Sequence, residues 1–167
     1  MQKNMSDALG AVLKDTDNRR IERGCSANYL IAHADGEIID IEATPNDYDY
    51  IYNNGTIAHT NHFLSGRLQI RDVGKALWPD SITRLLRMNR LLGRTSGEAD
   101  VESIKAMLRD HFGYPSSICR HPNEQAHELE QIETAASVII DLSERKMYAT
   151  EGPPCQQRYE AYTFEAS

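Results

Sequence analysis

The alternation of apolar and polar residues changes period along the chain and predicts both strands and helices. Residues 27–34 and 37–42 have strand-like sequences, and the Asp35-Gly36 pair between them is typical of a tight hairpin turn. Further strands are predicted over residues 48–52, 56–60, 136–142, 146–150 and 158–164. The segments 48–52 and 56–60 are expected to form a second hairpin, and 136–142 is expected to be a buried strand.

Apolar residues spaced three and four apart predict helices in three places. Ser6 is a good N-cap for a helix over residues 6–14. Asp80 or Ser81 can cap a second helix, which Gly93 ends. Asp100 opens a third helix, whose inward face carries Val101, Ile104, Leu108 and Phe112. The polar segment 123–133 is predicted to be a loop or a short helix. Without repeats or linkers, residues 1–167 are predicted to form a single α+β domain.

Length and charge narrow the class of protein. The chain has 167 residues and a net charge of −7, an acidic balance that argues against a nucleic-acid binder. It contains no apolar run long enough to span a membrane and no apolar segment typical of a signal peptide, so a cytoplasmic location is expected. The three cysteines are widely spaced, which favours free thiols over disulfides.

The densest polar cluster is His59-Thr60-Asn61-His62, at the end of a predicted strand. Strand ends are common positions for functional side chains. The amide N–H groups of Asn61 suit an oxyanion hole, whose donors are each worth about 3–4 kcal/mol to a hydrolase. The alternative is a turn that hydrogen-bonds its own backbone.

A second cluster spans residues 116–121 and contains Cys119, Arg120 and His121. The planar guanidinium of Arg120 suits a carboxylate or a buried acid, and the alternative is an exposed loop arginine. His59, His62, Cys119 and His121 are residue types that bind zinc. Their spacings are shorter than those usual in structural zinc sites, so no metal or other cofactor is expected. A metal-dependent hydrolase using His59, His62 and His121 is the weakest alternative.

Three other polar features favour structural roles. Arginines recur every three or four residues through Arg84, Arg87, Arg90 and Arg94, a spacing typical of a solvated helix face. Glu42, at a strand end, is expected to accept backbone N–H groups of the next turn. His111 is predicted to lie in the last turn of its helix, where it complements the helix dipole.

These segments follow one another in a distinctive order. They are Ser26-Ala27-Asn28-Tyr29-Leu30-Ile31, Glu42-Ala43-Thr44-Pro45, His59-Thr60-Asn61-His62-Phe63, Asp80-Ser81 with Arg84, Asp110-His111, Ser117-Ile118-Cys119-Arg120, Ala136-Ser137-Val138-Ile139 and Gly152-Pro153-Pro154-Cys155. The order resembles the C-terminal half of the isopenicillin N acyltransferase family (acyl-coenzyme A:6-aminopenicillanic acid acyltransferases). This family belongs to the N-terminal nucleophile hydrolases and is related to the choloylglycine hydrolases. The resemblance extends from Ser6 to Phe164.

The resemblance implies a four-layer αββα sandwich with antiparallel sheets and flanking helices. Members of the family cut their own chain before a cysteine, and that cysteine becomes the nucleophile with its own α-amine as the base. The substrate is a small-molecule amide or thioester. By this resemblance Asn61 helps to hold the oxyanion and Arg120 supports the site. His59, Thr60 and His62 shape the turn, and Glu42 and Cys119 belong to matching motifs without being nucleophiles.

The sequence departs from the family in length, because members are about twice as long and carry the nucleophile in their N-terminal half. We therefore expect this chain to be the C-terminal portion of a cysteine-dependent amide hydrolase or acyltransferase, inactive by itself. Gly24-Cys25-Ser26 looks like a cleavage sequence, but Cys25 falls on a segment that matches a non-catalytic strand of the family. Half a sandwich exposes an apolar face, which predicts a homodimer or a separately encoded N-terminal half. The alternative function is a non-catalytic binding or regulatory module that retains the fold.

Overall fold

The computed structural model describes residues 25–53, 55–69, 72–95, 98–127 and 131–164. The predicted helix over residues 6–14 lies outside them. The chain divides into two compact units, one comprising residues 1–57 and 62–73 and the other residues 58–61 and 74–167. The described residues form antiparallel sheets and helices, which confirms the α+β class. That residues 1–167 form a single domain stays a prediction.

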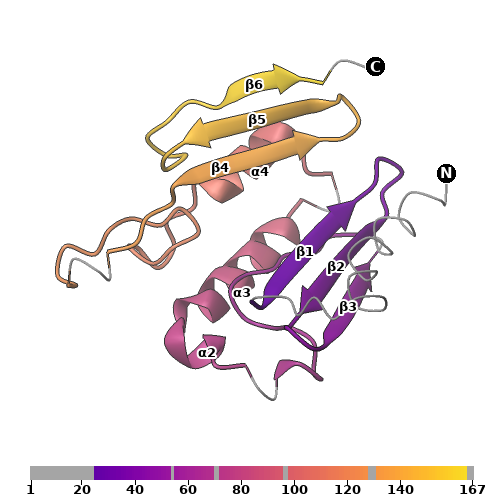
Figure 1. The fold of residues 1–167 in the computed structure, drawn as a ribbon. Helices are drawn as coiled ribbons and strands as arrows, with labels where there is room; N and C mark the ends of the chain where they lie inside the picture. The colour runs from indigo at the N-terminus through magenta and orange to yellow at the C-terminus, as the bar shows by residue number, and fades with distance from the viewer. Residues whose placement is uncertain (1–24, 54, 70–71, 96–97, 128–130, 165–167) are drawn as a thin grey trace. The chain divides into compact units, whose positions relative to one another are not determined.

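The first unit contains a three-stranded antiparallel sheet in the order β1-β2-β3 (Figure 1). Its strands are β1 (Ala27–Ala32), β2 (Ile38–Ala43) and β3 (Tyr48–Asn53). The predicted hairpin between β1 and β2 is confirmed, with Ala27 opposite Ala43 and Ala32 opposite Ile38. Gly36 in its turn has a φ of 97°, a backbone conformation that favours glycine.

The prediction that residues 48–52 and 56–60 form a second hairpin is wrong. β3 pairs with β2, and residues 56–60 form no strand. At the end of β3 the Asn53 side chain donates to the carbonyl of Thr56 and accepts from the N–H of Gly55. These local bonds replace a strand ladder with a turn, because an asparagine side chain can take the place of a backbone partner.

Strand β2 is the centre of the first unit and is buried on both faces. Ile39, Ile41 and Ala43 point to one face and form its apolar core. Asp40 and Glu42 point to the other face and are also fully buried. Since buried carboxylates require hydrogen-bond donors, this second face needs a cover of polar backbone.

The second unit contains the sheet β4-β5-β6, also antiparallel. Its strands are β4 (Ala136–Asp141), β5 (Lys146–Glu151) and β6 (Glu160–Thr163), close to the predicted segments. The expectation of a buried β4 is wrong. Ser137 and Ile139 are buried, whereas Val138 and Ile140 on the opposite face are more than half exposed.

Three described helices belong to the second unit (Figure 1). They are α2 (Gly74–Leu77), α3 (Asp80–Leu92) and α4 (Val101–Leu108), and α4 lies against β4. The segment 123–133 contains no helix among its described residues. Leu85 and Met107 are the buried apolar residues of α3 and α4.

Helix ends confirm some predictions and correct others. Asp100 caps α4 by accepting from the N–H of Ser103 at 2.7 Å, and Gly93 follows α3 as its C-cap. Pro79, not Asp80 or Ser81, is the N-cap of α3, and the side chains of Asp80 and Ser81 form hydrogen bonds elsewhere. Because α4 ends at Leu108, Phe112 lies beyond it and is 59% exposed instead of facing inward.

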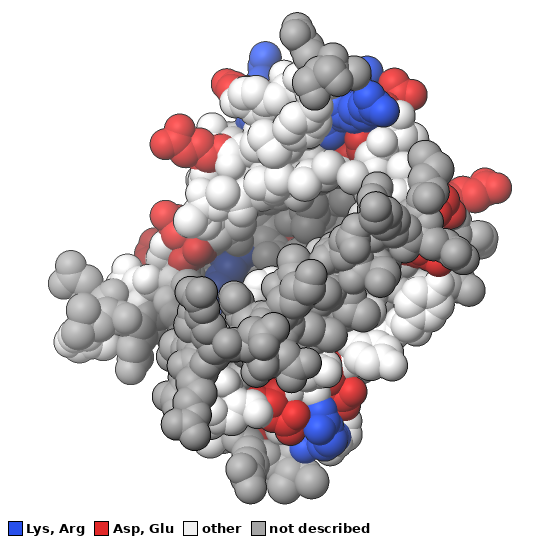
Figure 2. All heavy atoms as spheres, turned by 45° about the vertical axis from the view of Figure 1, so that its right-hand side comes forward, with Lys and Arg blue, Asp and Glu red and all other residues white. Residues whose placement is uncertain are grey.

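The described surface carries both signs of charge. On the face drawn in Figure 2, basic and acidic side chains form small separate groups, and the coloured residues make no continuous basic patch. Within the described part of the chain, no helix has the length and apolar character needed to cross a bilayer.

Candidate functional site

A hydrogen-bonded turn places Asn61 at the start of helix α3. The N–H of Asn61 donates to Oγ of Ser81 at 2.8 Å. Oγ of Ser81 in turn donates to Oγ1 of Thr60, which donates to the Ser81 carbonyl, both at 3.0 Å. Ser81 is fully buried, so this small network anchors the turn firmly to the helix.

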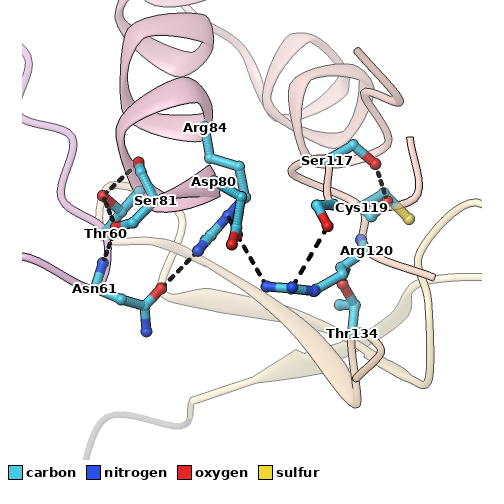
Figure 3. Close-up of polar contacts among 10 residues, drawn as sticks. Thr60, Asn61, Asp80, Ser81, Arg84, Ser117, Cys119, Arg120 and Thr134 are labelled. Atoms are coloured by element: carbon cyan, nitrogen blue, oxygen red, sulfur yellow. Dashed lines mark hydrogen bonds and ion pairs between the residues drawn. The ribbon is translucent and has the colours of Figure 1, made fainter. Parts of the chain in front are cut away.

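The amide of Asn61 is held in one orientation by Arg84, one turn into the same helix. Nη2 of Arg84 donates to Oδ1 of Asn61 at 2.8 Å. Since a guanidinium can only donate, the oxygen end of the amide must face Arg84 and the Nδ2 end must face away. Figure 3 shows this arrangement, with the amide nitrogen directed away from α3.

Asp80 joins the two arginines of the site. Its Oδ2 accepts from Nε of Arg84 at 3.0 Å and from Nη1 of Arg120 at 2.9 Å (Figure 3). The side chains of all three residues are less than a fifth exposed. A continuous chain of charge-assisted bonds therefore runs from Asn61 through Arg84 and Asp80 to Arg120.

The loop that carries Arg120 is fixed by its backbone. The N–H of Arg120 donates to Oγ1 of Thr134 at 2.8 Å, and its carbonyl accepts from the N–H of Thr134 at 3.0 Å. The Arg120 guanidinium also lies 6.0 Å from the ring centroid of Trp78. Of the two interpretations of Arg120, the structure supports the pairing with a carboxylate, which is that of Asp80, over an exposed loop arginine.

The arginines of α3 do not all form the solvated face that their spacing predicts. Arg84 and Arg87 are half-buried, whereas Arg90 and Arg94 are exposed. Nε of Arg87 lies 3.0 Å from each carboxylate oxygen of Asp110. This hydrogen-bonded pair holds the pKa of Asp110 below its usual range.

Glu42 and His62 both lie in the first unit. Both are buried, and the Glu42 carboxylate accepts from the backbone N–H groups of Leu64 and Ser65. Glu42 therefore does accept backbone donors, as predicted, but from a segment more than twenty residues further along. Beside it, the Ser65 hydroxyl donates to the carboxylate of Asp49.

Comparison of the sequence with models of known protein families gives a match. Residues 3–156 match the family described as acyl-coenzyme A:6-aminopenicillanic acid acyl-transferase. The chain belongs to this family. None of the curated proteins compared with it gives a match.

The cysteines of this acyl-transferase family member differ in their surroundings. Cys25 is an exposed free thiol of the first unit, two residues before β1. Cys119 is fully buried, and burial raises the pKa of its thiol to about 11. Cys119 is therefore a protonated thiol at neutral pH and a poor nucleophile. Cys155 is partly buried and shares its surroundings with Cys119.

Sequence reasoning singled out the two ends of the bonded chain, Asn61 and Arg120, but missed its middle. Asp80 was expected to cap the helix and Arg84 to face solvent. The Asp80-x-x-x-Arg84 spacing, four residues apart on one helix, was the available signal for their ion pair. Of the residues weighed as zinc ligands, His59 and His62 fall in different units, whereas Cys119 and His121 lie together with His111 and Cys155.

An open pocket in the second unit involves none of the predicted site residues. It has a volume of about 540 Å³ and lies over β5, β6 and the loop between them. Its lining is mainly polar and consists of Ala149, Thr150, Glu151, Gln157, Arg158, Glu160 and Tyr162. We assign it no role in the chemistry of Asn61 and Arg120.

Proposed function

We propose that this chain is the C-terminal part of a cysteine N-terminal-nucleophile acyltransferase or amide hydrolase. Asn61 contributes to its oxyanion region, and Arg120 supports the site. Membership of the acyl-transferase family supports the reaction class. The observation that carries the proposal is the bond from Arg84 to Oδ1 of Asn61, which leaves the Nδ2 end of the amide directed away from the helix.

Acyl transfer needs such a donor. When a thiolate attacks the carbonyl carbon of an amide or thioester, the carbonyl oxygen becomes an anion. An N–H group already held in place stabilises that anion without a cost of reorientation, and the loss of one such donor raises the barrier by about 3 kcal/mol. Asn61 is exposed, so its Nδ2 can reach a substrate.

The charge around Asn61 supports the same role. Arg84 and Arg120 contribute two positive charges, and Asp80 contributes one negative charge between them. The group therefore carries one net positive charge, which favours a developing oxyanion. Asp80 positions both arginines, so we propose it as a positioning residue and not as a base.

The nucleophile is proposed to lie on a segment outside these 167 residues. Cys119 is fully buried, and Cys25 falls on a segment that matches a non-catalytic strand of the family. The sheet β4-β5-β6 supports an additional layer, because one of its faces carries Val138, Ile140 and Tyr162, all about half exposed. Another sheet packed on this face, covered by its own helices, would give a four-layer sandwich.

The test begins with the DNA immediately before the Met1 codon. The proposal expects an in-frame or adjacent coding stretch with a Gly-Cys-Thr or similar sequence before a predicted strand. The chain is then purified alone and together with that segment. Coenzyme A release from an acyl-coenzyme A is followed with a thiol reagent.

We expect activity only when both parts are present. Asn61→Ala should then lower kcat by about 10²–10³-fold with little change in KM, whereas Asn89→Ala, an exposed asparagine of α3, should leave both unchanged. Cleavage of the acyl-coenzyme A by the chain alone would overturn the proposal that the nucleophile lies on a separate segment. Full activity of Asn61→Ala would overturn the oxyanion role. Unrelated upstream sequence together with an inactive chain would favour the non-catalytic binding module.

A further inference from the structure

Four side chains of the second unit converge on one point away from the Asn61 amide. They are His111, Cys119, His121 and Cys155, and one ligand atom from each lies within 4.8 Å of all the others. His111 follows α4, Cys119 and His121 lie on the loop of Arg120, and Cys155 lies between β5 and β6. Residues from distant parts of the chain therefore meet in one cluster.

The distances within the cluster fit a tetrahedral metal ion. Nε2 of His121 lies 3.0 Å from Nε2 of His111, 3.3 Å from Sγ of Cys155 and 3.7 Å from Sγ of Cys119. A zinc ion with its usual bond lengths to nitrogen and sulfur gives ligand-to-ligand distances of about 3.3–3.8 Å. These three distances lie within a few tenths of an ångström of the tetrahedral values, and the remaining pairs of ligand atoms lie no more than 4.8 Å apart.

Hydrogen bonding alone does not account for the convergence. The Nε2 atom of an imidazole has a single in-plane direction, which holds either one proton or one lone pair. His121 therefore makes one good hydrogen bond there, yet three acceptor or donor atoms surround it. A cation at the centre would satisfy all four side chains at once.

The backbone holds the four residues in place. The N–H of Cys119 donates to the Asp110 carbonyl at 3.1 Å, which joins the two loops. Nε of Arg109 donates to the Pro154 carbonyl at 2.8 Å and fixes the residue before Cys155. Cys119 is fully buried and His121 is 8% exposed, whereas Cys155 is partly buried and His111 is exposed, so the cluster reaches the surface on the His111 side.

We propose that His111, Cys119, His121 and Cys155 form a structural zinc site. Two cysteines and two histidines are a ligand set typical of zinc, and four protein ligands leave no open position for catalysis. Both thiols lose their protons on coordination and both imidazoles bind as neutral rings, so a Zn²⁺ ion replaces two protons. The bound ion takes no part in the bond-making steps of the proposed acyl transfer.

The zinc site also places Arg120. Cys119 and His121 flank this arginine in the sequence and bind the metal, while the Arg120 side chain extends the other way to Asp80 (Figure 3). Fixing both neighbours restricts the backbone of Arg120. Trp78 lies beside its guanidinium and is the single tryptophan of the chain, so its fluorescence reports this placement.

The test uses the complete chain, reduced and freed of metal by a chelator. Zinc is titrated in competition with a chromophoric chelator, and cobalt is bound in parallel as a spectroscopic probe. We expect one zinc per chain with a Kd below about 1 μM, which is ordinary for structural sites. Cobalt should give the intense visible bands of tetrahedral coordination and thiolate charge-transfer absorption. Zinc should also shift the Trp78 emission.

Variants locate the site. Cys155→Ser and His121→Gln should each weaken zinc binding at least tenfold. With cobalt, Cys155→Ser should reduce the thiolate charge-transfer band, and His121→Gln should shift the visible bands. The control Cys25→Ser should bind zinc as the wild type does. If the variants fail to fold, the wild-type titration and spectrum decide. Weak or non-stoichiometric zinc binding by the reduced wild type would overturn the proposal. This holds even if Cys119 and Cys155 are found to form a disulfide when the protein is oxidised. Undiminished binding by folded Cys155→Ser and His121→Gln would overturn it as well.

Discussion

Arg84 donates a hydrogen bond to Oδ1 of Asn61 at 2.8 Å across 23 residues of sequence. Its Nε is held by Asp80 at 3.0 Å, so the guanidinium has little freedom to turn. The direction of the Asn61 amide is therefore set by helix α3 and not by the turn alone. This dependence can be tested without knowing the substrate.

Replacing Arg84 should release the Asn61 amide. In Arg84→Met, Oδ1 of Asn61 loses its charged donor and the side chain gains rotational freedom. NMR relaxation of the Asn61 side-chain NH₂ should report increased motion, while the backbone N–H bond to Ser81 persists. Arg90→Met, an exposed arginine of the same helix, is the control. Equal motion in wild type and Arg84→Met would contradict the assigned bond.

Replacing Asp80 should destabilise the second unit. In Asp80→Ala, Arg84 and Arg120 lose their common acceptor while both remain mostly buried. We expect the free energy of unfolding to fall by about 2 kcal/mol, as is usual when a hydrogen-bonded charge loses its partner. Urea unfolding measures this change. Glu102→Ala, which removes a mostly exposed carboxylate of α4, should cost less than about 1 kcal/mol.

The Asp49 carboxylate should make stability depend on pH. The Ser65 hydroxyl, the N–H of Tyr50 and the charge of Arg67 hold its pKa below the usual value. A lowered pKa in the folded state contributes stability that is complete above the unfolded-state value of about 4. This stability is lost as the pH falls through the lower folded-state value.

Unfolding of Asp49→Asn measures that contribution. The variant should be less stable than the wild type at pH 7, and the difference should shrink as the pH is lowered below about 4. Glu124→Gln, a change at an exposed carboxylate, is the control variant. A difference that stays constant down to pH 2 would show that the effect of Asp49 is not a titration.

The first unit should depend strongly on its central strand. Ile41 of β2 is fully buried, and Ile41→Ala should lower the free energy of unfolding by about 2–5 kcal/mol. Leu30 of β1 is 52% exposed, so Leu30→Ala should cost less than about 1 kcal/mol. Chemical denaturation of both variants gives the comparison. Similar losses would mean that Leu30 is covered in solution.

Local patterns predicted most of the regular structure. The Asp35-Gly36 turn, the Asp100 cap and the Gly93 end depend on the conformational preferences of a few adjacent residues. The predicted strand over residues 56–60 does not form, because the Asn53 side chain makes hydrogen bonds that close a turn there instead. The prediction that Phe112 faces inward was wrong, because α4 ends earlier than the spacing of its apolar residues indicates.

The sequence by itself determined the α+β class, most of the strand segments and the family, because all three depend on the order of residue types along the chain. It also pointed to Asn61 and Arg120. Only the tertiary structure decided that Asp80 and Arg84 join them, and that His111 and Cys155 meet Cys119 and His121. Partners ten to forty residues apart meet only when the intervening elements pack, and no local pattern encodes that packing.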